Sequence, residues 1–449
     1  MTGDITAALA QWVADMRYET LPEAVRREAR RSFVNFIGCA LGGANHEAVT
    51  ATAATLDEFS GPRHATVIGR RERLDPLGAA FVNCMSSAVH TFDDTHLKSI
   101  LHAGGPVSAA SCAVTERQIV AGKELLAALA IGIEVACRVG NMLCVAPARA
   151  NISVFMTGVA GGIGAAAAAA RLMALGAEGI QRAIGIAVAQ SAGVREMHGT
   201  MCSSFVPGNA SRAGLFAALL AARGLTTAPR SLEGPKGLGN VFASPANPDA
   251  VLDRLGTEYE ILFNTYKPYP CGIAIHPAID AALEIVAQHH PDPTRIEHIE
   301  VIVHPVGTQL TGRPDPADSL QAQVSIPHWV AASFLRHTAG IAEGSDACVR
   351  DPKVIGLRSR VRVVSNEGTQ PPEASMSVTM ADGAILRSHV QYCRGSHERP
   401  LTDHELDDKF LTQAIPVLGD RPSRDLLTRC WNVEASVDLR PLLIASAPR

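Results

Sequence analysis

The chain has 449 residues, of which 47% are hydrophobic and only 4% aromatic, and this length corresponds to two or three domain-sized units. The formal net charge of −4 argues against nucleic acid or an anionic membrane as the main partner. The ten cysteines are scattered without a CxxC pair, so we interpret them as buried thiols in a reducing compartment and not as a disulfide framework.

The N-terminal stretch MTGDITAALAQW carries no basic leader and no long apolar core, which predicts a cytoplasmic protein without a secretory signal. The apolar stretch 158–175 has nearly the length of a membrane span. It consists mainly of Gly and Ala and contains Arg171, which favours a buried helix instead.

Apolar residues at helical spacing dominate residues 4–223. Pro22 stands where the first turn of a helix accepts proline, and Gly42-Gly43 marks the end of that helix. The stretch 64–69, HATVIG, alternates briefly and predicts a short strand. The expected helices cover residues 4–15, 21–43, 46–59, 77–88, 106–117, 122–143, 155–174, 178–194 and 210–223.

Two polar stretches interrupt this helical half. The first, HTFDDTHLKSILHAGGP at 90–106, holds acid, base and cation side chains within one loop, a combination that suits chemistry on a carboxylate substrate. The second, REMHGTMCSSFVPGNASR at 195–212, holds His198 and Ser203. We interpret it as a loop between two helices, which becomes a site candidate only if it faces the first stretch.

The pattern changes after residue 262. Alternation with β-branched residues predicts strands, and Asp382-Gly383 is a strong hairpin signal. After Pro400 the chain returns to helix, where Thr402 and Glu405 match a capping box. The expected elements are helices 274–289 and 330–337, strands 296–304, 358–365, 373–380 and 384–392, and helices 403–417 and 423–445.

These patterns predict a mainly α protein with a large all-helical domain and a smaller α+β domain. The helical domain would be discontinuous, with residues 1–262 and 402–449, because the last helices are expected to pack back on the first half. Residues 263–401 would form the α+β domain. No His/Cys ligand spacing appears, and the glycine run at 161–164 lacks a phosphate-loop context, so neither a metal nor an organic cofactor is expected.

Short motifs lie along nearly the whole chain. In the helical half they are Phe92-Asp93-Asp94-Thr95 with His102 and Gly104, then Gly164 to Leu175, Gly208-Asn209-Ala210 and Arg212-Ala213-Gly214. Further along they are Tyr266 to Cys271 with His276 and Asp280, and Gly395 with Pro400-Leu401-Thr402, Glu405-Leu406 and Lys409-Phe410. In this order they resemble the MmgE/PrpD family, which includes 2-methylcitrate dehydratase, cis-aconitate decarboxylase and iminodisuccinate epimerase. The resemblance implies a helical domain with a smaller α+β lid, a homodimer, and activity without metal or organic cofactor.

The chain departs from the pattern of that family at four places. The family commonly has Asp at Thr91, His-Pro at Phe155-Met156, Lys at Ser203 and Tyr at His328. Members that expel hydroxide or carbon dioxide use some of these polar groups, so their loss argues against dehydratase and decarboxylase activity. Iminodisuccinate epimerase is the family member whose chemistry needs only the groups that remain.

Four residues are predicted to be catalytic. His102 is the natural base, because the ordinary pKa of a histidine lies near neutrality, and Lys267 can stabilise charge that builds up on a carboxylate. Tyr266, Tyr269 or Lys267 could return the proton on the other side of the same carbon, and the sequence does not choose among them. The predicted substrate-binding residues are Asp93, Asp94, Thr95, Lys98, Ser203 and His328.

We therefore expect a cofactor-independent epimerase that abstracts a proton alpha to a carboxylate of a small polycarboxylic acid, most closely iminodisuccinate. A dehydratase acting on tricarboxylic acids such as 2-methylcitrate is the first alternative. A non-catalytic member that binds a small acid is the second, because fold does not fix function. In each case the partner is a small di- or polycarboxylate, with no role for nucleic acid or a membrane.

Overall fold

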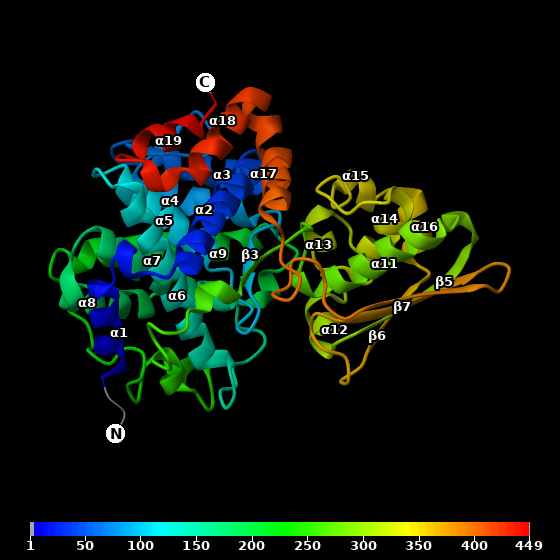
Figure 1. Cartoon of the computed structure of the whole chain (residues 1–449), viewed down its shortest axis with the longest axis horizontal. Coiled ribbons are helices and arrows are strands. Elements are labelled where there is room, and N and C mark those ends of the chain that lie inside the picture. The colour runs from blue at the N-terminus through cyan, green and yellow to red at the C-terminus, as the bar shows by residue number, and fades with distance from the viewer. Residues whose placement is uncertain (1–3, 449) are drawn as a thin grey trace.

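The computed structural model describes residues 4–448 and consists of a larger helical body joined to a smaller part that carries a sheet (Figure 1). The fold class is therefore mainly α with a smaller α+β part, as predicted. The helices of the body are α1 (Ile5–Asp15), α2 (Glu23–Gly43), α3 (Glu47–Glu58), α4 (Pro76–Ala88), α5 (Gly104–Thr115), α6 (Gly122–Cys144), α7 (Met156–Leu172), α8 (Gly176–Val188), α9 (Cys202–Ala221) and α10 (Leu238–Phe242).

Close helix packing around α7 explains the glycine- and alanine-rich sequence of the body. A Cβ atom at Gly164 would overlap the carbonyl oxygen of Gly132 on α6, and one at Gly214 on α9 would overlap the carbonyl of Gly162. Small residues thus let three buried helices approach until their backbones touch. The glycine run at 161–164 serves packing, as its lack of phosphate-loop context predicts.

The first two C-terminal helices lie against α2 in the helical body, and the last one packs on the helix before it (Figure 1). Phe410 is buried in the same apolar core as Phe33 and Phe36, and the ammonium of Lys409 donates to Asn35 at 2.7 Å. The predicted discontinuous domain of residues 1–262 and 402–449 remains a prediction that this packing supports. These helices are α17 (Asp403–Leu418), α18 (Asp420–Trp431) and α19 (Arg440–Ala445).

A four-stranded sheet in the order β6-β5-β7-β8 organises the smaller part. Its strands are β5 (Ile296–Val303), β6 (Val361–Ser365), β7 (Ala374–Met380) and β8 (Ile385–Val390). β5 runs parallel to β6 and antiparallel to β7, which forms the predicted hairpin with β8. Alternate residues of β7 are buried because the strand has one covered face.

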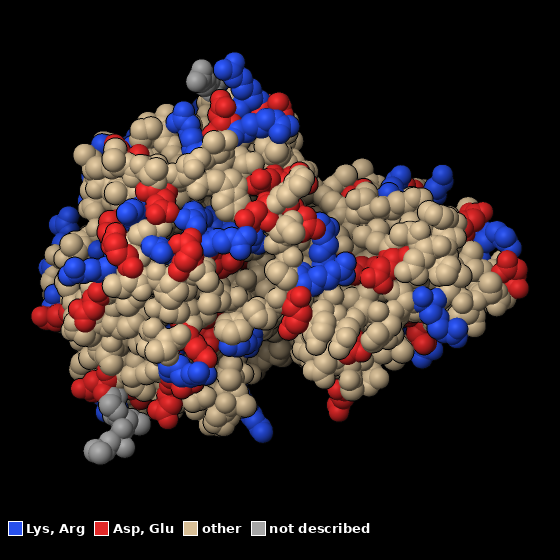
Figure 2. Space-filling model, in the orientation of Figure 1, with Lys and Arg blue, Asp and Glu red and all other residues tan. Residues whose placement is uncertain are grey.

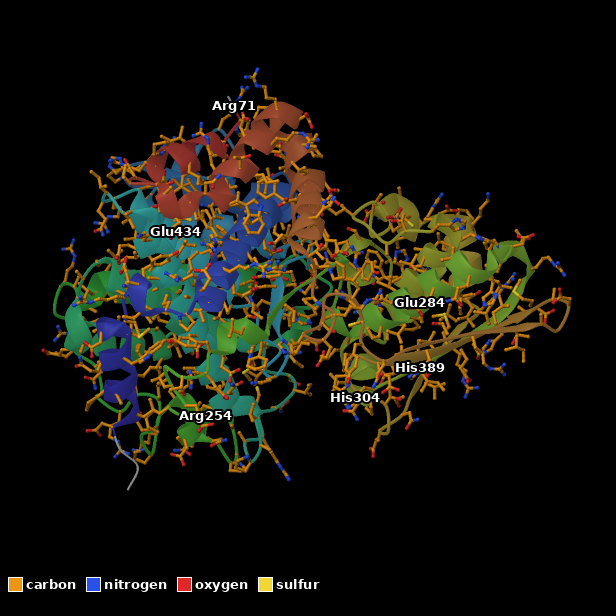
Figure 3. The ribbon with its side chains drawn as sticks, in the orientation of Figure 1. Arg71, Arg254, Glu284, His304, His389 and Glu434 are labelled. Atoms are coloured by element: carbon orange, nitrogen blue, oxygen red, sulfur yellow. The ribbon has the colours of Figure 1, made fainter. Side chains whose placement is uncertain are left out.

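Helices cover that face of the sheet, and a second apolar core lies between them (Figure 1). Glu284 on one helix reaches the sheet and accepts a hydrogen bond from Ser388 of β8 at 2.8 Å (Figure 3). The contacts with the strands come from α11 (His276–His289), α12 (Pro305–Thr311) and α14 (Ile326–Arg336). The other helices of the smaller part are α13 (Ser319–Ala322), α15 (Asp346–Val349) and α16 (Pro352–Arg358).

Several expected boundaries differ from the structure. The expected strand at 64–69 is only β1 (Ala65–Thr66), paired with β2 (Arg73–Leu74). The expected helix 423–445 breaks between α18 and α19, and Pro441 stands in the first turn of α19, where a helix accepts proline. Helix α9 begins at Cys202, inside the stretch 195–212 that we interpreted as a loop, because burial of an apolar face overrides local propensity.

The burial of the long apolar helices and the charges on the surface address whether an apolar segment of the chain could span a membrane. α6 has the length and composition of a membrane span, but the whole apolar segment is buried inside the molecule. The stretch 158–175 is likewise largely a buried helix, α7, as predicted. On the face shown in Figure 2, basic and acidic side chains alternate, and neither sign dominates.

Candidate active site

Two short strands bring together the polar stretches that the sequence singles out in each half. β3 (Asp94–His96) pairs antiparallel with β4 (Asn264–Tyr266). The backbone N–H of Lys267 continues the pairing by donating to the Asp93 carbonyl at 3.4 Å. Because successive side chains of a strand point to opposite faces, Lys267 and Tyr266 are directed to different sides.

Lys267 and Asp93 form a buried ion pair at this junction. The ammonium of Lys267 donates to Oδ1 of Asp93, and neither side chain is more than slightly exposed. The same carboxylate oxygen lies 3.8 Å from Nδ1 of His102. Burial alone would raise the pKa of Asp93, but His102 and Lys267 outweigh it, so this pKa lies below its ordinary value.

The hydrogen bonds of His102 fix which of its nitrogens is basic. Nδ1 lies 2.7 Å from the carbonyl oxygen of Asp94 and 3.2 Å from the hydroxyl of Thr95. Because a carbonyl only accepts, Nδ1 carries the hydrogen and Nε2 keeps its lone pair. Burial, partly offset by Asp93, lowers the pKa of His102 to about 4, so the imidazole is neutral at pH 7.

A cavity with a volume of about 70 Å³ lies beside this arrangement. A water molecule needs about 10–15 Å³ on such a measure, so the cavity is large enough for a small ligand. It contains four of the predicted site residues, namely Asp93, His102, Ser203 and Lys267. Its other polar lining residues are Thr91, Arg195, His198, Thr311 and Gln323, none of which the sequence had placed in the site.

The second polar stretch of the helical half therefore does face the first. Arg195 and His198 come from the turn η2 (Arg195–Met197) and the loop that follows it. Nε of Arg195 donates to the Val154 carbonyl at 3.1 Å, while its terminal nitrogens have no hydrogen-bond partner within residues 4–448. Only the polarity of this stretch signalled these residues in the sequence, and nothing distinguished Gln323.

The two tyrosines predicted as proton donors do not line the cavity. The hydroxyl of Tyr266 points toward the carbonyl of Glu28 at 3.4 Å, on the other side of the strand pair. The hydroxyl of Tyr269 donates to Asp280 at 2.5 Å. Burial, reinforced by these acidic neighbours, raises the pKa of both phenols above the ordinary value.

Asp94 and Thr95 support the site from behind and do not line the cavity. The carboxylate of Asp94 accepts hydrogen bonds at 2.8 Å from the Gly104 N–H, at the start of α5, and from Asn264. Burial and the neighbouring Asp93 raise the pKa of Asp94 to about 6. The Asp94 carboxylate therefore satisfies a free N–H at the start of α5, and the Asp94 carbonyl orients His102.

Lys98 and His328 lie away from the cavity. The ammonium of Lys98 donates to Glu260 at 3.0 Å and sits over the ring of Phe263 on the outside of the molecule. His328 is fully buried in the core of the smaller part, where Nε2 lies 2.8 Å from the carbonyl of Glu343. Both residues therefore lack access to a ligand in the cavity.

Comparison with known proteins places this arrangement in a family. Residues 7–250 match the MmgE/PrpD N-terminal domain, and residues 269–433 match the MmgE/PrpD C-terminal domain. The chain belongs to the MmgE/PrpD family. The match to the C-terminal domain extends across α17, which packs on α2 in the helical body.

Relatives of this MmgE/PrpD protein extend over nearly its whole length. A cis-aconitate decarboxylase-like protein of Aspergillus oryzae is 25% identical, covering 98% of this chain and 97% of its own. The cis-aconitate decarboxylase of Mus musculus is 27% identical over 95% of this chain and 90% of its own length. The human cis-aconitate decarboxylase is 26% identical, with corresponding coverages of 97% and 92%.

The positions at which this MmgE/PrpD chain departs from the family resemblance gather at the cavity. Thr91, Phe155 and Ser203 all line it, whereas His328 does not. The cavity therefore presents a hydroxyl, an aromatic ring and a second hydroxyl where an acid, an imidazole and an ammonium are common in the family. Within the described residues, no cluster of three or more His, Cys, Asp or Glu side chains has the geometry of a metal site.

Two β-branched residues at the cavity adopt backbone conformations that such residues rarely take. Thr91 has a φ of 50° and Ile100 a φ of 48°, both in the left-handed region. The Thr91 hydroxyl donates to the side-chain oxygen of Gln323 at 2.5 Å, and the amide of Gln323 donates to the Val89 carbonyl at 2.9 Å. Strain of this kind concentrates at functional sites, which supports the cavity as the active site.

Proposed function

We propose that this chain is a cofactor-independent enzyme that removes a proton alpha to a carboxylate of a small polycarboxylic acid and returns it with inversion. Iminodisuccinate is the substrate that fits this chemistry best. The observation that carries the proposal is the orientation of His102, whose Nδ1 is held at 2.7 Å from the Asp94 carbonyl so that Nε2 is the basic nitrogen. A fixed neutral imidazole beside a cavity is what general-base catalysis requires.

The charges around the cavity support a carboxylate substrate. Removal of the alpha proton builds negative charge on the carboxylate oxygens, which preorganised cations stabilise when water is excluded. Lys267 supplies one cation, although Asp93 already shares its charge. Arg195 supplies a second cation whose terminal nitrogens can form two parallel hydrogen bonds with a carboxylate. We assign Arg195 to binding one carboxylate of the substrate. We assign Lys267 to stabilising the charge on the carboxylate next to the reacting carbon.

The family departures favour epimerisation over elimination. Expulsion of hydroxide or carbon dioxide draws on polar groups that are replaced here by Thr91, Phe155 and Ser203, all on the cavity wall. Proton removal and return need only a base, an acid and cations, and these remain.

Proton exchange tests the proposed function directly. The single stereoisomers of iminodisuccinic acid, incubated with the protein in deuterated water, should acquire deuterium at the alpha carbon and interconvert, as followed by proton NMR. The His102→Gln variant should lose conversion. Absence of exchange and of conversion in these acids, with a folded wild-type protein, would contradict the proposal.

A lyase acting on a tricarboxylic acid is the second candidate. It is favoured by the full-length relatives named as cis-aconitate decarboxylases. Incubation with cis-aconitate should then release carbon dioxide, and incubation with 2-methylcitrate should form an alkene that absorbs in the ultraviolet. Either product at rates above those of alpha-proton exchange would favour the lyase over the epimerase.

Assembly and compartment complete the proposal. We expect a homodimer in the cytoplasm, without a nucleic-acid or membrane partner and without a metal or organic cofactor. Light scattering at several protein concentrations would measure the assembly. Chelator treatment that abolishes activity, followed by recovery with one divalent metal, would contradict the expectation of metal-free activity.

A further inference from the structure

The loop that carries His198 is fixed against the segment around Phe155. The backbone N–H of Phe155 donates to the Gly193 carbonyl at 3.1 Å, and the N–H of Arg195 donates to the Ser153 carbonyl at 2.8 Å. A further hydrogen bond runs from the Arg195 side chain to the same segment. The position of His198 at the cavity is therefore defined by hydrogen bonds on the residues that precede it.

The imidazole of His198 differs in its contacts from those of four other histidines that are buried or half-buried. His90, His96, His102 and His328 each have a ring nitrogen within hydrogen-bond distance of a protein oxygen. Neither ring nitrogen of His198 has a hydrogen-bond partner in the part of the chain that the structure describes. Because the residue lines the cavity, its nitrogens are available to a ligand there.

His198 and His102 share one aromatic neighbour. The Phe155 ring lies 4.8 Å from the His198 ring, centroid to centroid, and 6.0 Å from the His102 ring, with both pairs edge to face. Two imidazoles thus line the same cavity from separate segments, because His102 follows β3 in the chain and His198 follows η2. Phe155 stands where the family often has a histidine, so the neighbouring loop supplies an imidazole that this position lacks.

We propose that His198 is the second proton-transfer residue of the cavity, adding a proton to the face of the substrate carbon opposite to the face from which His102 removes one. This inference rests on the proposed function. In one direction, Nε2 of His102 takes the alpha proton, the C–H electron pair enters the carboxylate as an enolate, and protonated His198 gives its proton to the other face. His102 ends protonated and His198 neutral, and solvent exchange resets both.

The charges of the cavity are compatible with this division of roles. Burial, and then Arg195, His102 and Lys267, lower the pKa of His198 to about 4. A polycarboxylate brings negative charge next to both imidazoles and raises their pKa values, so substrate binding favours protonation of one of them. The tyrosines could not serve as this second group, because Tyr266 and Tyr269 point elsewhere.

The test separates epimerisation from exchange in His198→Gln and His102→Gln, with each stereoisomer of iminodisuccinic acid in deuterated water. His198→Gln should lower epimerisation at least 100-fold. It should still exchange the alpha proton of the isomer that His102 serves, within tenfold of the wild-type rate and without inversion. His102→Gln should show the reverse preference, exchanging only the opposite configuration. His404→Gln makes the same chemical change on an exposed helix and should match wild type in both measurements.

Two outcomes overturn this assignment while the proposed function stands. One is epimerisation by His198→Gln within threefold of wild type. The other is equal loss of exchange for both configurations in a folded His198→Gln protein, which would indicate a role outside proton transfer. His198→Asn provides a second amide variant if the glutamine does not fit. Wild-type protein without exchange in any isomer would instead overturn the proposed function, and this inference with it.

Discussion

The two walls of the cavity satisfy their polar groups in different ways. On the wall formed by β3 and β4, Lys267 pairs with Asp93, and His102 is held by the Asp94 carbonyl. On the wall formed by η2 and the start of α9, His198 and Ser203 have side chains without a hydrogen-bond partner among residues 4–448. Both walls line one cavity, but only on the first wall do these side chains have partners within the protein.

This difference separates groups that are organised in advance from groups that await a ligand. Buried polar atoms are nearly always paired, because an unpaired one costs about 1–3 kcal/mol. The wall formed by β3 and β4, the strand wall, therefore contributes to the stability of the protein as well as to its chemistry. The wall formed by η2 and the start of α9, the loop wall, contributes little to stability, so substitutions there should change ligand interactions while leaving the fold intact.

The largest effect should come from Lys267→Met on the strand wall. The substitution leaves the Asp93 carboxylate buried without its cation, and breaking a buried pair in this way costs about 3–5 kcal/mol of unfolding free energy. Activity should fall further, by about 2–4 kcal/mol of transition-state stabilisation, by analogy with lost oxyanion donors. Urea unfolding and the rate of alpha-proton exchange measure the two losses separately.

The double variant Asp93→Asn/Lys267→Met distinguishes the two roles of the lysine. It removes both charges, so much of the lost stability should return, whereas activity should remain low because the cation is still absent. If the single Lys267→Met variant keeps the stability of wild type, the pair does not support the strand wall as described. If it keeps full turnover, Lys267 has no role in the reaction.

His102→Gln should give the next largest effect, and it should be confined to chemistry. Removing a positioned general base typically costs about 10²–10⁴-fold in rate. Binding should largely persist, since the cations Lys267 and Arg195 are untouched. A thermal shift produced by a dicarboxylate should therefore be similar in the variant and in wild type, because a ligand that binds only the folded state raises apparent stability.

The same variant should change how stability depends on pH. His102 has a folded pKa of about 4, below its ordinary value of 6.5, so between these values the unfolded chain binds a proton that the folded chain does not. Stability from this group is complete above pH 6.5 and is lost as the pH falls toward 4. At about 1.4 kcal/mol per pKa unit, the loss is on the order of 3 kcal/mol.

Other groups titrate in this window, and Asp94, with a pKa raised to about 6, acts with the opposite sign. Comparing wild type with His102→Gln isolates the contribution of His102, because Asp94 is present in both proteins. The unfolding free energy of His102→Gln should fall less steeply than that of wild type between pH 6.5 and 4. Equal slopes would mean that this imidazole is not held in the neutral form by burial.

Arg195→Met on the loop wall should act mainly on substrate binding. The variant loses one protein hydrogen bond, from Nε to the Val154 carbonyl, and the terminal nitrogens have none to lose, so stability should fall by only about 1–2 kcal/mol. A hydrogen bond to a charged group contributes about 1.5–3 kcal/mol, which predicts a rise in KM of roughly 10–100-fold with a smaller change in kcat. The exposed Arg223→Met is the matched control and should leave both constants unchanged.

The sequence predicted more of the fold than of the cavity, and the reason is physical. Helical spacing over α6 and alternation over β5 and β7 depend on local burial, which is visible in neighbouring residues. The pairing of β3 with β4 joins two three-residue segments about 170 positions apart, and neither alternates long enough to predict a strand. Gln323 is likewise held at the cavity by residues far away in the sequence, through hydrogen bonds with Thr91 and the Val89 carbonyl.

The tyrosines show the same limit at the level of single residues. Tyr266 and Lys267 are adjacent in the sequence, and both belong to the motif that carries the family resemblance. Once β4 forms, alternation sends one side chain to the cavity and the other toward α2. The residue types were informative about chemistry, whereas the strand register, which no local pattern revealed, decides which of them can act.

The smallest effect should come from Lys98→Met, which the sequence predicted to bind substrate. Its ammonium pairs with Glu260 at 3.0 Å, and the side chain is 42% exposed, so solvent and salt screen the pair. Surface pairs of this kind contribute about 0–1 kcal/mol, and KM and kcat should stay within about twofold of wild type because the residue lies outside the cavity. Steady-state kinetics and urea unfolding, both at low and at high salt, measure these quantities. A KM raised tenfold at unchanged stability would show that substrate reaches Lys98, and the cavity bounded by His102 and Arg195 would then be only part of the binding site.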